Sequence, residues 1–326
     1  MVVPARARTQ GRHTRLTVRA CASATPAQTW AGVAVFSSIL DAIGRTPLVR
    51  LARLGRDLPV ELYGKVEACN PGGSAKDRLA LHLCDMAEKR GLLRPGGTIV
   101  EASAGNTGVG LSMVAAVRGY HSIVVVPHGT SPDKLAVVRA LGAEIRECAP
   151  DEDYVEVAEA LAQKRRAFRP DQFHNPDNPE SHGLTTAQEI LADLDGRVDV
   201  LVAACGTGGT LAGVGRALRE KNPKLHLVRV IPIADDGGES KLEGIAPEGP
   251  PASFMCPEPG AEVHVKDGDA RAAMQRLARE EGILAGGSAG AALAGALQHA
   301  RELPAGARVV VILPDTGRNY VGSLAR

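Results

Sequence analysis

The chain has 326 residues, of which 44% are hydrophobic and 23% are charged, and its formal net charge is +1. This composition is ordinary for a globular protein of one large domain or two modest ones. The balanced charge gives no reason to expect nucleic acid or an anionic membrane as a partner. No apolar run approaches the roughly 20 residues that a membrane-spanning helix needs.

Residues 1–36 predict a leader that precedes the folded part. The stretch is rich in arginine, serine, threonine and alanine, and the first acidic residue of the chain is Asp41. Such a composition is typical of an organelle transit peptide, and the alternative is a disordered basic tail. Residues 18–22 favour the plastid stroma over the mitochondrion. Without a targeting signal the protein would remain in the cytoplasm.

From about residue 60, strand and helix patterns alternate regularly. Strands are expected at residues 60–67, 98–101, 121–127, 144–148, 198–204, 225–231 and 308–313. Helices are expected at residues 77–90, 108–118, 134–141, 154–167, 185–194, 211–221, 270–281 and 289–303. This alternation predicts parallel sheets covered by helices on both faces. Residues 232–259, rich in proline, glycine and acidic residues, predict a long loop bordering the ligand site.

The six cysteines predict neither a disulfide framework nor a zinc site. No pair has the CxxC spacing, and Cys84 and Cys205 lie in apolar segments. Cysteines in such segments are usually small core residues. We therefore expect no bound metal ion and a reducing compartment.

The turn Gly206-Thr207-Gly208-Gly209-Thr210 closely follows an expected strand and opens an expected helix. Its glycines let the backbone approach an anion, and the free N–H groups at the helix start can hold a phosphate. A tight turn without a ligand is the alternative. A nicotinamide-dependent dehydrogenase is disfavoured, because its third fingerprint glycine would fall at Leu211.

Two further glycine-rich turns also open expected helices. Residues 103–108, SAGNTG, offer N–H groups and side chains to a carboxylate or another anion, or they simply cap the helix. Residues 286–290, GGSAG, open the last long helix. Three such turns at the carboxyl ends of parallel strands predict a ligand with several polar groups.

Lys76 lies in the segment NPGGSAKDR at residues 70–78, where an expected helix begins. A lysine at a helix N-terminus meets the positive end of the helix dipole, which lowers the pKa of its amine. A lysine that forms a Schiff base needs such an amine. An isolated lysine is otherwise an ordinary solvated charge.

These four segments occur in the order found in the cysteine synthase and cystathionine β-synthase family, which the chain resembles from about residue 43 to its end. Residues 43–50, IGRTPLVR, are similar to the opening of that family's catalytic core. The resemblance implies an α/β fold with two parallel-sheet domains, the tryptophan synthase β-like or type II pyridoxal-phosphate fold. Residues 37–326 would form the catalytic core, with a mobile smaller subdomain at about residues 80–180.

The resemblance also implies how the cofactor, pyridoxal 5'-phosphate, is held. Lys76 would form a Schiff base with it and later move the α-proton of the substrate. Asn106 would hydrogen-bond the ring hydroxyl, and the turn Gly206-Thr207-Gly208-Gly209-Thr210 would hold the phosphate. Ser288 would face the pyridine nitrogen. Because a hydroxyl does not keep that nitrogen protonated, the ring would be a weaker electron sink, which favours prompt β-elimination.

For the amino-acid substrate, the resemblance implies a site at the second glycine-rich turn. Ser103, Gly105 and Thr107 would hold the substrate carboxylate, with Gln172 nearby. The family's usual loop reads PTSGNT where this chain has ASAGNT, so a hydroxyl is missing at Ala104. This departure affects the choice of substrate rather than the binding of the cofactor.

Two branches of the family are open, and we favour a cysteine synthase that joins O-acetylserine and sulfide. The alternative is a cystathionine β-synthase that uses serine and homocysteine. Residues 116–120, 286–290, 311–315 and 318–320 resemble that branch. Phe173, where that branch usually has tyrosine, argues against it. A dehydratase of the same fold fits less well. A non-catalytic homologue that binds a partner such as serine acetyltransferase should have lost Lys76. By resemblance the protein is expected to be a homodimer.

Overall fold

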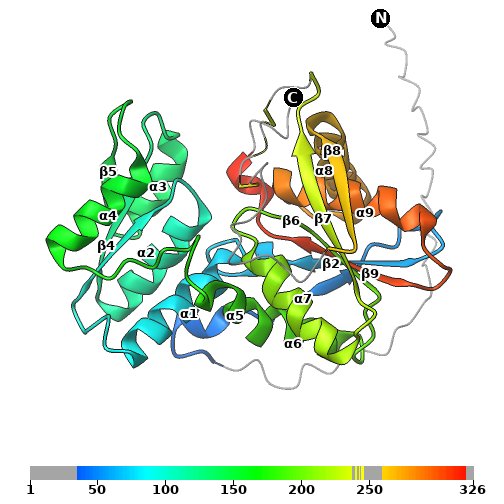
Figure 1. The fold of residues 1–326 in the computed structure, drawn as a ribbon, viewed down its shortest axis with the longest axis horizontal. Coiled ribbons are helices and arrows are strands. Elements are labelled where there is room, and N and C mark those ends of the chain that lie inside the picture. The colour runs from blue at the N-terminus through cyan, green and yellow to red at the C-terminus, as the bar shows by residue number, and fades with distance from the viewer. Residues whose placement is uncertain (1–34, 237–238, 241, 243, 246–258, 321–326) are drawn as a thin grey trace, which may run out of the picture. The chain divides into compact units, whose positions relative to one another are not determined.

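The computed structural model describes residues 35–236, 239–240, 242, 244–245 and 259–320 (Figure 1). The predicted leader lies outside these residues except for its last two positions. Most of the loop predicted at residues 232–259 also lies outside them.

The larger sheet has six strands in the order β1-β2-β9-β6-β7-β8 (Figure 1). Every neighbouring pair in it is parallel except β1 and β2, which run antiparallel. Its strands are β1 (Leu48–Arg50), β2 (Glu61–Val66), β6 (Val200–Ala204), β7 (His226–Ile233), β8 (Ala261–Lys266) and β9 (Arg308–Leu313). The two edge strands, β1 and β8, were not predicted. β1 has only three residues. In β8, charged and polar residues alternate with alanine and valine, so its apolar content is low.

Helices cover both faces of this sheet. Successive side chains of a strand point to opposite faces, and in β6 Val202 joins the core under α8 and α9 while Leu201 joins the core under α6 and α7. These helices are α6 (Thr186–Asp193), α7 (Gly209–Lys221), α8 (Asp267–Glu281) and α9 (Gly287–His299). The apolar strands thus have both faces buried, as expected for a parallel sheet.

The smaller sheet has three parallel strands, β3 (Thr98–Ala102), β4 (His121–Val126) and β5 (Glu144–Glu147), in the order β3-β4-β5. Val125 of β4 packs in the core under α4, and Val124 packs on the other face with residues of α3. The helices of this part of the chain are α1 (Lys76–Lys89), α2 (Asn106–Arg118), α3 (Pro132–Ala140) and α4 (Tyr154–Arg165). The prediction of an α/β fold with two parallel sheets is confirmed.

Helix α5 (Asp177–Leu184) was predicted as a polar loop, and this was wrong. Its buried face carries Asn178, Ser181 and His182 instead of an apolar stripe, so hydrophobic periodicity does not reveal it. The helix packs closely on α7: a Cβ added at Gly213 would lie 1.9 Å from the carbonyl oxygen of Pro179. Glycine at this position therefore lets the two helix backbones meet.

Cys84 and Cys205 are buried, as the sequence predicts for cysteines in apolar segments, and so is Cys148. Cys69 is free and exposed. In the described residues we find no helix with the length and apolar content to cross a membrane.

Candidate active site

The predicted turns meet at the carboxyl end of the larger sheet. The backbone N–H of Ala75, just before Lys76, donates to the carbonyl of Pro314 at 2.8 Å, so the lysine segment is joined to the end of β9. The N–H of Gly286 donates to the carbonyl of Asp315 at 3.2 Å, which joins the start of α9 to the same place. Asn106 reaches it from the start of α2.

Lys76 is the first residue of α1, where the sequence places it, and it is half-buried. The pKa of its amine is lowered, mainly because burial removes water from the ammonium group, while Asp315 acts in the opposite direction. A neutral amine is the nucleophilic form. Burial thus lowers this pKa by a cause that the sequence argument, which started from the helix terminus, did not include.

A buried ionic network fixes the segment around Lys76. The Arg78 Nε donates to Glu67 at 2.7 Å and its Nη1 donates to Glu189 at 2.6 Å. Lys65, whose side chain is fully buried, lies 2.8 Å from Glu189. Although burial raises the pKa of Glu189, the hydrogen bonds from Arg78 and Lys65 lower it to about 2. Paired charges of this kind hold a unique geometry, because an unpaired one would be costly to bury.

The turn predicted to bind phosphate opens α7 and has the shape of an anion cradle. Gly208 has φ +81°, a left-handed conformation that glycine adopts without strain. A Cβ at Gly206 would lie 2.4 Å from the carbonyl oxygen of Gly244, and a Cβ at Gly209 would lie 1.9 Å from Asn178 Oδ1. Only glycine fits at these two positions, and N–H groups at a helix start can receive an anion.

Asn178 of α5 joins this turn to the predicted substrate site. Its Nδ2 donates to Thr207 Oγ1 at 3.0 Å and to the carbonyl of Gln172 at 2.7 Å. Thr107 donates to Gln172 Oε1 at 2.6 Å. Because Thr207 also accepts from the N–H of Gly209 at 3.3 Å, its hydroxyl proton remains available for a ligand. Asn178 was not predicted as a site residue, because α5 was predicted as a loop.

His182 is a second residue of α5 that supports the turn. Its Nε2 lies 3.2 Å from Thr210 Oγ1 and its Nδ1 lies 3.1 Å from Thr186 Oγ1. Burial, with help from the charge of Lys76, holds the pKa of His182 well below its usual value. The imidazole is therefore neutral, and it holds Thr210 without placing a charge beside the anion site.

Ser103 orders the second turn through its hydroxyl group. Its Oγ accepts from the N–H groups of Gly105 at 3.3 Å and Gly108 at 3.1 Å. Gly105 is exposed, and nothing lies within 4 Å of a Cβ built there. Ala104 is half-buried in the same loop. The loop is thus ordered by Ser103 and open at Gly105, which leaves backbone N–H groups for a substrate.

Asn106 and Ser288 meet at Asp315, a buried carboxyl that follows β9. Asn106 Nδ2 donates to Asp315 Oδ2 at 3.0 Å, and the Tyr320 hydroxyl donates to the same oxygen at 2.9 Å. Burial raises the pKa of Asp315, while hydrogen bonds from Asn106, Tyr320 and Ser288 oppose the rise. Asp315 was part of a segment quoted for the family resemblance, but it was not predicted as a site residue.

Glu101, at the end of β3, positions the backbone next to Gln172. Its Oε2 accepts from the N–H of Asp171 at 2.9 Å. Burial raises the pKa of Glu101 to about 8, against the hydrogen bonds from residues 171 and 172 and the charge of Arg169. The folded protein thus keeps a proton here at pH values where the unfolded chain has lost it.

We predict that Glu101→Gln flattens the dependence of stability on pH. Because the folded-state pKa of Glu101 is raised, its ionisation makes the folded protein less stable as pH rises from about 4.5 to 8. Denaturant unfolding at pH 5 and pH 8 should show a loss smaller by about 1–4 kcal/mol in the variant. Asp77, whose pKa burial raises to about 7, contributes in the same direction in both proteins. An equal loss in both would contradict this role of Glu101.

One group of possible metal ligands is found among the described residues. Ligand atoms of His82, Asp177 and Glu180 all lie within 4.8 Å of one another. Both oxygens of Asp177, however, accept from Arg90, at 2.6 and 2.8 Å. An ion there would compete with the Arg90 guanidinium, which donates two hydrogen bonds to Asp177. The expectation from the sequence that no metal ion is bound stays a prediction.

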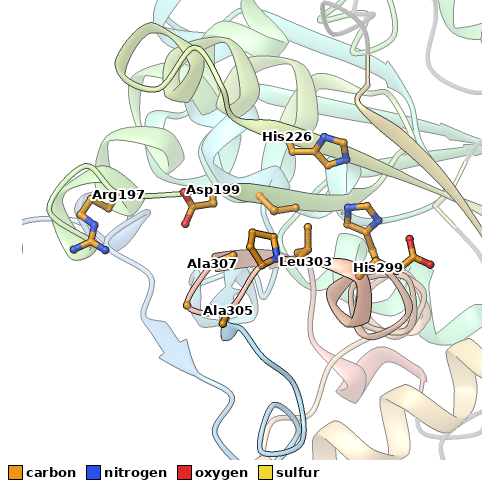
Figure 2. A pocket seen from close by; sticks show the side chains of 11 residues that line it. Arg197, Asp199, His226, His299, Leu303, Ala305 and Ala307 are labelled. Atoms are coloured by element: carbon orange, nitrogen blue, oxygen red, sulfur yellow. The ribbon is translucent and has the colours of Figure 1, made fainter.

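A separate cavity of about 620 Å³ lies at the opposite edge of the larger sheet (Figure 2). Asp199 precedes β6, His226 begins β7 and His299 ends α9, so its lining comes from the amino ends of the strands. The two imidazole rings stack with their centroids 5.0 Å apart. The cavity contains none of the predicted site residues, which lie at the carboxyl ends of the strands.

Comparison with known proteins identifies the class. Residues 39–315 match the family model of pyridoxal-phosphate-dependent enzymes. The chain is 40% identical over 306 residues to a cystathionine β-synthase of Apis mellifera, covering 88% of this chain and 61% of that protein. It is 39% identical over 296 residues to a cysteine synthase of Staphylococcus aureus, covering 88% and 96%. The solved structure of an O-ureido-L-serine synthase has a TM-score of 0.83 and 43% identity, covering 88% and 94%.

The chain therefore belongs to the pyridoxal-phosphate-dependent enzymes and has their type II fold. Within them it is an enzyme of the cysteine synthase and cystathionine β-synthase group. It spans about six tenths of the length of the bee cystathionine β-synthase. The residues present fit the cofactor: a glycine cradle for an anion, a half-buried lysine of lowered pKa, and a shielded Asp315 oxygen without a close hydrogen bond to a described residue.

Proposed function

We propose that the protein replaces the β-substituent of a serine-type amino acid, and that it makes L-cysteine from O-acetylserine and sulfide. The observation that carries this proposal is the half-buried Lys76, of lowered pKa, at the meeting point of three glycine-rich turns. The similarity to a cysteine synthase of Staphylococcus aureus, 39% identical over 296 residues, supports this choice of branch.

Each residue has a distinct role in this proposal. The bound cofactor withdraws electrons and so stabilises negative charge at the α-carbon of the amino acid. Lys76 holds the cofactor through its amine and moves the α-proton. The turn that contains Gly206, Thr207, Gly208, Gly209 and Thr210 binds the phosphate, and Asn106 and Ser288 orient the ring.

The substrate is held at the second turn. We propose that the N–H groups beside Gly105 and the hydroxyl of Ser103 bind its carboxylate. Thr107 and Gln172, which are buried and hydrogen-bonded to each other, fix the wall of this site. Asn178 donates both to the carbonyl of Gln172 and to Thr207, so it links the substrate site to the phosphate turn.

Cystathionine β-synthesis is the second candidate. The specific observation in its favour is the sequence from Val311 to Tyr320, which resembles that branch and includes the buried Asp315. That candidate requires serine and homocysteine as the reacting pair.

Substrate assays on the chain from about Ser37 onward separate the two candidates. O-acetylserine alone should change the visible absorption of the cofactor, and sulfide should restore it with release of cysteine. Reaction only with serine and homocysteine would select the second candidate. A cofactor spectrum that responds to neither donor would contradict both.

We predict that Ala104→Ser increases the apparent affinity for the amino-acid donor. A hydroxyl there would add a hydrogen bond to the substrate carboxylate, worth about 1.5–3 kcal/mol, which corresponds to a KM about tenfold or more lower. Ala160→Ser, at an exposed position of α4, is the matched control and should leave KM unchanged. An unchanged KM in Ala104→Ser would place the carboxylate elsewhere.

The expectations for the assembled protein are also proposals. We propose a homodimer in the plastid stroma, a smaller subdomain at about residues 80–180 that moves during the reaction, and serine acetyltransferase as a possible partner. Light scattering of the purified chain tests the dimer, and a fusion of residues 1–36 to a fluorescent protein tests the destination.

A further inference from the structure

Both walls of the proposed substrate site begin at the carboxyl end of β3. The strand itself runs into the loop that starts at Ser103. On its free side the N–H of Val100 donates to the carbonyl of Phe168 at 2.9 Å, and the N–H of Phe168 donates to the carbonyl of Thr98 at 2.9 Å. The segment that leads to Gln172 thus starts as a short parallel neighbour of β3.

This backbone pairing stops before it reaches the site, because Pro170 has no N–H to donate. The side chain of Glu101, the next-to-last residue of β3, continues it: its Oε2 accepts from the N–H of Asp171 at 2.9 Å. The side chain is buried, since only 2% of the residue is exposed. The carboxyl group therefore stands where a backbone carbonyl would otherwise accept, and water competes little for the bond.

Asp171 has a backbone conformation that needs such support. Its φ is +50°, a left-handed conformation that residues with a side chain seldom adopt. Its carbonyl accepts from the N–H groups of His174 at 3.1 Å and Asn175 at 2.9 Å. A conformation of this kind persists where the neighbouring structure holds it on both sides. Glu101 holds the N–H side, so the chain enters Gln172 in a fixed direction.

That direction brings the amide of Gln172 to Thr107 in the opposite wall. The Thr107 hydroxyl donates to Gln172 Oε1 at 2.6 Å, and both residues are buried. Because the amide oxygen is used in this bond, Gln172 can offer its NH₂ group to a ligand. A carboxylate accepts hydrogen bonds only and is a fitting partner for an NH₂ group held beside backbone N–H groups.

We propose that Glu101 is a positioning residue for the amino-acid donor, which holds the N–H of Asp171 so that Gln172 meets the substrate carboxylate. The inference rests on the substrate placement in the proposed function. Glu101 itself touches neither the substrate nor the cofactor in this proposal. Its loss should therefore weaken binding of the donor and leave the chemistry and the binding of the cofactor in place.

The test replaces Glu101 in the holoenzyme with methionine, which is similar in size but accepts no strong hydrogen bond. Glu101→Met should raise the KM for O-acetylserine about tenfold or more, with little change in kcat or in the affinity for pyridoxal phosphate. Glu101→Gln should restore a KM close to that of the wild type. Burial raises the pKa of Glu101 to about 8, so at pH 7 the carboxyl is mostly neutral and an amide, which keeps an acceptor oxygen, is its close mimic.

Val100→Ala is the control for a general loss of stability in β3. Val100 precedes Glu101 and is fully buried in the core under α4. Removing two methyl groups from this core should lower the melting temperature. It leaves the hydrogen bond to Asp171 intact and should leave KM as in the wild type.

A wild-type KM in Glu101→Met, or a KM raised equally in Glu101→Gln or Val100→Ala, would overturn the proposal. Hydrogen exchange of the Asp171 amide keeps it testable if Glu101→Met does not fold: the amide should exchange as slowly as those inside β3, and fast exchange would overturn the role of Glu101. The same samples separate this inference from the proposed function. An active wild type with an unchanged Glu101→Met overturns only the role of Glu101, whereas a wild type that responds to no amino-acid donor overturns both.

Discussion

Replacing Lys76 with alanine should abolish the visible absorption band of the lysine-bound cofactor and lower β-replacement activity by about 10³-fold or more. The variant loses both the amine that attaches the cofactor and the group that moves the α-proton. Alanine has a high helix propensity, so α1 should remain intact in the variant. The measurements are the absorption spectrum after loading and the steady-state rate with O-acetylserine and sulfide.

Lys89→Ala is the matched control for this variant. Lys89 ends the same helix and is exposed, so its loss removes a positive charge from α1 without touching the site. It should keep the spectrum and the rate. If Lys76→Ala keeps the visible band, another amine binds the cofactor and the assignment of Lys76 is wrong.

Much of this site could be predicted from local sequence signals. Glycine-rich turns between a strand and a helix are recognisable because they need residues without side chains, and the positions of Gly206 and Gly209 show the physical reason: an added Cβ would meet protein atoms at 2.4 and 1.9 Å. Apolar strands such as β9 were predicted because both faces are buried. Lys76 was found because it precedes a clear helical pattern.

The residues that support the site were not predictable in the same way. Asn178 and His182 lie on α5, a helix whose buried face is polar, so neither hydrophobic spacing nor propensity marks it. Asp315 gains its importance only from Asn106, Ser288 and Tyr320. Such contacts arise from the fold as a whole, and no local pattern encodes them.

Gly209→Ala should weaken cofactor binding. The added Cβ would lie 1.9 Å from Asn178 Oδ1 and 2.5 Å from its Cγ, and Asn178 is fully buried. Relieving this overlap costs about 1–3 kcal/mol and displaces the side chain that holds Thr207. The affinity for pyridoxal phosphate should fall about tenfold or more, since each 1.4 kcal/mol is a factor of ten.

Gly213→Ala separates this effect from a general loss of stability. Gly213 lies one turn further along α7, and its Cβ would lie 1.9 Å from the Pro179 carbonyl oxygen, so the variant crowds the same contact between α5 and α7 away from the phosphate turn. Both variants should lower the melting temperature, but only Gly209→Ala should lower cofactor affinity, measured by fluorescence titration well below the transition. Equal losses of affinity would mean that the packing of α5 on α7, and not the cradle at Gly209, controls the binding of the phosphate.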